Sequence, residues 1–298
     1  MSNRIKTIEL FLALGVATAV GTQAITSNAY EIEETDTEAY SLMAQGGEGG
    51  EGGEGGEGGE GGEGGEGGEG GEGGEGGEGG EGGEGAVSSG DADVDYMALL
   101  GLMKGHLTVA EELVAAGNYE QVEPHVSHTV EKLYVDIEPA LSERGVEDFK
   151  PTLNQLQESI ASDPESPEVQ TLLDESTTSI DEAIAAIPEE QLSSPEFVLD
   201  SIVEMLKNAA GEYEAAIVDN QFVEILEYQN SFGIVYYADE LYQTVADQKS
   251  QVDSEGDRVI SDTLAELKTA LPSIEPPSAP IKEPSEVYSL VSQIEFNK

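Results

Sequence analysis

The sequence of 298 residues contains no cysteine, no tryptophan and only three histidines. The lack of cysteine excludes disulfides, thiolate metal sites, a cysteine nucleophile and a lipid-modified N-terminal cysteine. Oxygen and imidazole groups remain as metal ligands. Because phenylalanine is also scarce, at six residues, the aromatic part of a core must come mainly from tyrosine.

Basic residues are scarce as well. The chain has 12 Lys and Arg against 62 Asp and Glu, which gives a formal net charge of −50. It therefore lacks the basic surface that phosphate backbones and anionic lipid head groups require, and we expect no nucleic-acid partner. The charge attracts cations, but solubility in salty surroundings is the simpler explanation, so charge alone indicates no metal site.

Residues 1–29 have the order of a secretory signal peptide. Arg4 and Lys6 precede the apolar run Leu10–Val20, and small residues follow up to Ala29. This order predicts a periplasmic or secreted protein from which the segment is cleaved. A spanning helix takes about 20 apolar residues, so we expect no membrane span in the mature chain. Retention of the segment as an N-terminal anchor is the alternative.

A low-complexity tract dominates residues 30–90. Between Gly46 and Gly85 the unit Gly-Gly-Glu repeats and places thirteen glutamates at every third position. Glycine at two of three positions raises the entropy of the unfolded backbone, and no apolar side chain offsets it. We therefore expect a disordered acidic linker. Collagen is excluded because the tract has no imino acids, and a weak cation-binding tail is the alternative.

Helical periodicity begins after Gly90. It predicts an all-α fold, an up-and-down helical bundle over residues 91–271, with a Pro-rich linker and a short C-terminal helix over 272–298. The expected helices cover 93–116, 119–144, 146–161, 222–248 and 257–271, and two more begin at Ser166-Pro167 and Ser194-Pro195. We expect the terminal helix to dock through Tyr288, Leu290, Ile294 and Phe296.

All three histidines lie in the first helical hairpin. His106 shares an apolar arc of the first helix, so it should point inward. His125 and His128 form an HxxHxxE spacing with Glu131 on the second helix. Side chains three residues apart lie on one side of a helix, so neighbouring members of this motif can share a ligand.

The turn at Gly117 brings these residues to one level. His106 lies eleven residues before it and His128 eleven after it, and packed helices are about 8–10 Å apart. We therefore predict a metal site made by His106, His125, His128 and Glu131. Imidazole and carboxylate without thiolate suit iron, zinc or copper(II) better than calcium. Against this, a regular helix places His128 over 90° from the apolar stripe, where it would face water; His106 would then be a hydrogen-bonded core residue.

A second pair of helices carries acidic and tyrosine residues on both sides of Asp219-Asn220. Glu224 and Glu227 lie three residues apart, and Tyr213 should lie level with Glu227. Paired carboxylates hold metal in di-iron bundles, but those bundles also supply histidines, and this half of the chain has none. A solvated acidic rim beside a tyrosine-rich core is the favoured interpretation.

Two short segments resemble known families. His128-Thr-Val-Glu131 resembles the HxxE element of imelysin-like periplasmic proteins, although Val126 stands where that family has a glycine. The segment from Glu212-Tyr213 to Gln229 resembles the extracytoplasmic helical domain of bacterial iron permeases, and the permease region itself is missing. Both resemblances imply a helical protein with a role in iron uptake outside the cytoplasm.

The sequence has no phosphate-binding loop, no GxSxG elbow and no HExxH helix, so we do not expect an enzyme. A redox activity at a bare metal centre is the alternative. The leading hypothesis is an exported metal-binding or metal-delivery protein whose partners are a metal ion and an envelope transporter or receptor. The alternative is a non-catalytic acidic structural or interaction module of the cell envelope, without a specific metal site.

Overall fold

The computed structural model describes residues 87–298, and these residues form helices with one very short β-hairpin. The prediction of an all-α, up-and-down bundle is confirmed. The predicted signal peptide (1–29) and the Gly-Gly-Glu tract lie outside the described residues. The helices are α1 (Ala92–Ala116), α2 (Val122–His128), α3 (Tyr134–Arg144), α4 (Lys150–Ser162), α5 (Pro167–Ile184), α6 (Glu189–Leu192), α7 (Pro195–Ala215), α8 (Ile225–Gln243), α9 (Ala246–Val252), α10 (Ser254–Ala270) and α11 (Pro284–Asn297).

The first helix has a clear beginning and end in the sequence. The Asp91 side chain accepts hydrogen bonds from the first backbone amides of α1, as an N-cap does. Gly117 ends the helix in the left-handed conformation, with φ 73°. Because both signals are local, the predicted range of 93–116 is close to the observed one.

The second predicted helix is not one regular helix. The 3₁₀ turn η2 (Tyr119–Gln121) precedes α2, and the π-helical turn η3 (Thr129–Leu133) separates α2 from α3. A π turn holds an extra residue and changes the direction of the side chains that follow it. The uniform helix predicted over 119–144 is therefore wrong in its interior, directly after His128.

The connection between α7 and α8 turns at Asp219-Asn220, as predicted, but the helix predicted from residue 222 does not begin there. The connection is a β-hairpin of β1 (Ile217–Val218) and β2 (Gln221–Phe222), in which Ile217 pairs with Phe222. Glu224 is the N-cap of α8 and not part of the helix. At the other end, α8 stops at Gln243 and α9 follows after a short break, so the predicted helix over 222–248 is divided.

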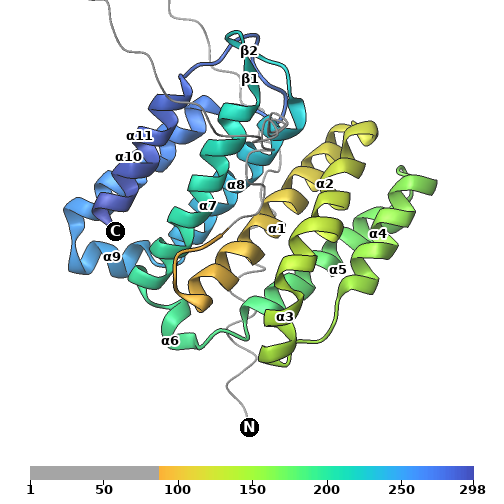
Figure 1. Ribbon diagram of the computed structural model, residues 1–298, viewed down its shortest axis with the longest axis horizontal. Helices are drawn as coiled ribbons and strands as arrows, with labels where there is room; N and C mark the ends of the chain where they lie inside the picture. The colour runs from red at the N-terminus through yellow and green to blue at the C-terminus, as the bar shows by residue number, and fades with distance from the viewer. Residues whose placement is uncertain (1–86) are drawn as a thin grey trace, which may run out of the picture. The chain divides into compact units, whose positions relative to one another are not determined.

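Helix α1 packs against two groups of helices (Figure 1). On one side it contacts α7 and α8, and on the other it contacts α2 and α5. Helix α8 is buried around most of its circumference, including the consecutive residues Tyr228 to Val235. The polar side chains within that stretch therefore lie in the interior, where they need hydrogen-bond partners.

Helix α11 packs on α7 and α10. Its start has a capping box, in which Glu283 and Glu286 each accept a hydrogen bond from the other's backbone amide. Leu290 and Ile294 are buried as predicted, whereas Phe296 is 86% exposed, so its predicted docking is wrong. No helix within residues 87–298 is long and apolar enough to cross a membrane.

Candidate metal centre

The three imidazoles lie together where α1 meets α2. The rings of His106 and His128 are stacked, with centroids 4.6 Å apart and planes 16° apart. The ring of His125 is tilted toward His106, at a centroid distance of 5.9 Å. The antiparallel hairpin therefore brings the histidines to one level, as the equal spacing around Gly117 predicts.

All three imidazoles are held in the neutral form by their surroundings. Burial lowers the pKa of His106 well below its usual value, and His128 and His125 lower it further. Burial lowers the pKa of His125 to about 4, although the neighbouring Gln229 and Asn230 side chains oppose this. Burial and the charge of Lys132 lower the pKa of His128. Because metal ions bind neutral imidazole, protons do not compete for these rings near pH 7.

Two ring nitrogens in the cluster are buried without a hydrogen-bond partner. They are Nδ1 of His106 and Nδ1 of His125, in side chains that are 3% and 0% exposed. A buried polar atom without a partner is destabilising in a folded protein. The two unpartnered ring nitrogens are therefore the most unusual polar atoms of the cluster.

His128 lies closer to the other rings than a regular helix predicts. It is half-buried and stacked on His106. Helix α2 contacts α1, α4 and α8, so contact with other helices extends well beyond its apolar stripe. The interpretation that His128 faces water is therefore wrong. It considered only the position of His128 relative to the apolar residues of its own helix and not the neighbouring helices.

Glu131, the predicted carboxylate ligand, lies on the π turn and is exposed. The charges that act on the three imidazoles come from the other histidines and from Lys132. Among residues 87–298, no three His, Asp or Glu side chains are already arranged to hold a metal ion. A metal would therefore require at least one ring to rotate, or would bind with fewer protein ligands.

Sequence reasoning missed the polar side chains of α8 that contact the cluster. Gln229 Oε1 lies 3.0 Å from His125 Nε2, and both side chains are buried. Asn230, the next residue, donates from Nδ2 to Glu212 Oε2 at 3.5 Å. Glu212 is only 6% exposed, whereas the solvated acidic rim was expected here. One pattern in the sequence could have indicated these buried polar side chains. It is the run of consecutive polar residues Gln229-Asn230-Ser231 between Tyr228 and Phe232.

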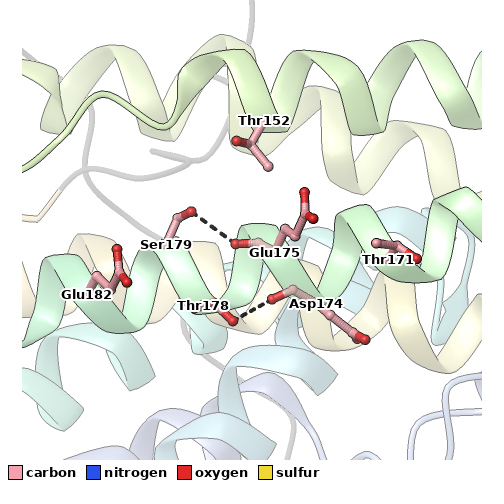
Figure 2. A pocket seen from close by; sticks show the side chains of 7 residues that line it. All are labelled: Thr152, Thr171, Asp174, Glu175, Thr178, Ser179 and Glu182. Atoms are coloured by element: carbon pink, nitrogen blue, oxygen red, sulfur yellow. Dashed lines mark hydrogen bonds between the residues drawn. The ribbon is translucent and has the colours of Figure 1, made fainter. Parts of the chain in front are cut away.

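A surface groove of about 420 Å³ lies between α4 and α5, and Figure 2 shows its lining side chains. Its acidic members, Asp174, Glu175 and Glu182, are exposed. The hydroxyls of Thr178 and Ser179 donate to backbone carbonyls one turn earlier in their own helix. None of the seven lining side chains has a buried polar atom without a partner, so the histidine cluster is the stronger candidate site.

Residues 188–297 match a protein family described as iron permease-associated 4-helix bundle domain. The matched segment includes the long helices α7, α8, α10 and α11, together with Gln229. It supports the resemblance to iron permease helical domains carried by Glu212-Tyr213 to Gln229, and the imelysin-like resemblance is not shown. The histidines lie before the matched segment. No curated protein and no solved structure matches the chain.

Proposed function

We propose that this chain is an exported, non-catalytic iron-binding protein that works with an iron transporter of the cell envelope. The observation that carries the proposal is the cluster of three imidazoles with two buried, unpartnered Nδ1 atoms. The family match at residues 188–297 favours iron over copper or zinc. The proposed location rests on the signal-like order of residues 1–29.

His106, His125 and His128 would hold the ion, which is the cargo of the protein. Neutral imidazoles suit Fe(II), Cu(II) and Zn(II), and they suit Ca(II) poorly because that ion prefers oxygen ligands. Glu131 would supply a carboxylate from the exposed π turn. Because the ligands are not prearranged, at least one imidazole ring must rotate when the ion binds, and this rotation costs free energy. We therefore expect an affinity low enough for the ion to be released.

Thermal unfolding of the full chain tests the proposal. Metal-free protein is titrated anaerobically with Fe(II), and with Ca(II) as a control for charge screening. A ligand that binds only the native state stabilises it by about 2.7 kcal/mol at a hundredfold excess over Kd. For a domain of this size that corresponds to a rise in Tm of several degrees. We expect this rise once free Fe(II) exceeds Kd about a hundredfold, and not at the same concentration of Ca(II).

Variants separate the site from the general acidity of the chain. His128→Gln should remove most of the Fe(II)-dependent rise, and Glu131→Gln should remove a smaller part of it. Glu123→Gln, at an exposed position of α2, is the matched control and should leave the rise unchanged. An equal response to both ions in all variants would show charge screening and would refute the proposal.

The alternative is an interaction module that binds no metal. It is favoured by the absence, within the described part of the chain, of any three side chains prearranged for a metal ion. Under this alternative the histidines are core residues and the acidic surface meets a basic partner. The same titration decides between the two, because the module would show no Fe(II)-specific change in Tm.

A further inference from the structure

The side chain of Gln229 has only one orientation that satisfies its neighbours. Its Nε2 donates to the Gln121 side chain at 2.7 Å and lies 3.5 Å from the backbone carbonyl oxygen of Ile274. A carbonyl oxygen only accepts hydrogen bonds, so the group that faces Ile274 must be the NH₂ group. The amide oxygen Oε1 therefore faces His125.

This orientation determines where the proton of His125 lies. Oε1 of Gln229 only accepts, and it is 3.0 Å from His125 Nε2, so Nε2 must carry the hydrogen. A neutral imidazole has one ring proton. Nδ1 of His125 therefore carries a lone pair, and it is the same buried atom that has no hydrogen-bond partner.

We infer that Gln229 is a positioning residue that fixes His125 in the Nε2–H tautomer, so that His125 binds a metal ion through Nδ1. The part of this inference that concerns metal rests on the proposed function, whereas the tautomer does not. Hydrogen bonds of this kind hold the rings of metal-binding histidines, and their loss commonly lowers metal affinity about 10–100-fold. The inference also gives the segment matched by the permease-associated family a direct effect on a cluster that lies outside it.

Asn230, the residue after Gln229, places a second buried polar side chain on α8. Its Nδ2 donates toward Glu212, which leaves Oδ1 as a second buried acceptor without a partner.

The tautomer can be measured directly, because the chain has only three histidines. Long-range ¹H–¹⁵N NMR of the metal-free full chain distinguishes a ring nitrogen that carries hydrogen from one that does not. His106→Gln and His128→Gln spectra assign the signals. We expect His125 to be Nε2–H in the wild type. In Gln229→Leu the two nitrogens of His125 should move toward averaged shifts, and Gln229→Glu, which still accepts a hydrogen bond, should keep Nε2–H.

Gln157→Leu is the matched control, because Gln157 donates to Ser127 on α2 at 2.8 Å. It should leave the His125 shifts unchanged, and circular dichroism checks that each variant is folded. A wild-type His125 with its proton on Nδ1, or unchanged shifts in folded Gln229→Leu, would overturn the inference. If Gln229→Leu does not fold, the wild-type tautomer and the Gln229→Glu spectrum still decide it.

Anaerobic Fe(II) binding then tests the consequence. Gln229→Leu should bind Fe(II) at least tenfold more weakly than the wild type, and Gln157→Leu should bind as the wild type does. An unchanged Fe(II) affinity in Gln229→Leu would overturn binding through Nδ1. If the wild type binds no Fe(II) and His125 is still Nε2–H, the positioning of His125 stands and the proposed function fails.

Discussion

A Cβ atom placed on Gly233 would lie 2.2 Å from the backbone carbonyl oxygen of Gly105. Helices α1 and α8 therefore touch backbone to backbone at this point, which only glycine allows. A Cβ on Gly105 would in turn lie 3.0 Å from the backbone nitrogen of Ile234. Because His106 follows Gly105, this contact also sets how closely the histidine cluster lies to α8.

Replacing Gly233 with alanine should strongly destabilise the protein. The new methyl group meets backbone that cannot rotate away, so α1 and α8 must move apart. We expect a loss of about 3 kcal/mol in the free energy of unfolding, measured by urea denaturation. Gly211→Ala is the matched control on α7, because a Cβ there meets only the Tyr288 hydroxyl at 3.9 Å. That variant should gain up to ~1 kcal/mol from helix propensity, and equal losses in both would contradict the explanation.

The position of the histidines was predictable because it depends on local signals. Asp91 and Gly117 fix the ends of α1, and equal spacing around Gly117 places His106 level with His128. In an antiparallel hairpin with a short turn, residues at equal distances from the turn lie opposite each other. The helix boundaries at Ser166-Pro167 followed from the same kind of local signal.

The partners of the histidines were not predictable in this way. Gln229 is about 100 residues from His125 in the sequence, and a helical count says nothing about which distant helix packs against a given face. The π turn after His128 also changes the direction of later residues, such as Glu131, and no residue type marks it. Buried polar partners and irregular turns depend on tertiary contacts.

Acid should destabilise the metal-free protein through its histidines. The pKa of His125 is lowered from 6.5 to about 4 in the native state, so the unfolded chain takes up a proton first as the pH falls. Stability from this group is present above pH 6.5 and is lost as the pH falls toward 4. We expect a loss of a few kcal/mol, measured by urea denaturation between pH 7.5 and 4.5.

The carboxylates also titrate in this range, so a variant must isolate the histidine. His125→Gln should reduce the slope of stability against pH between pH 6.5 and 4.5, whatever its effect on stability at pH 7.5. A variant with the same slope as the wild type would show that burial of His125 is not the cause.

Glu111 should destabilise the native state at neutral pH. Burial and the nearby charge of Asp174 raise the pKa of Glu111, while Lys104 opposes them. The ionised form is therefore disfavoured in the folded protein, and this penalty is relieved as the pH falls through the raised pKa. Glu111→Gln keeps an acceptor for Thr177 and should raise stability at pH 7 by up to ~1 kcal/mol. Glu112→Gln, at the exposed next position, is the control; if it stabilises as much, general charge repulsion is responsible.

The β-hairpin between α7 and α8 gives a test of backbone conformation alone. Asp219 and Asn220 both have positive φ angles, of 50° and 60°. Two such residues in a two-residue loop form the type I′ turn, for which Asp-Gly is preferred over Asp-Asn. Asn220→Gly should therefore raise the free energy of unfolding by a few tenths of a kcal/mol, whereas Asn220→Val should lower it by roughly 1–2 kcal/mol. Thermal unfolding at pH 7 measures both changes. Because the three histidines lie together where α1 meets α2, the Fe(II) response should stay the same. Opposite signs for the two variants would attribute the effect to φ.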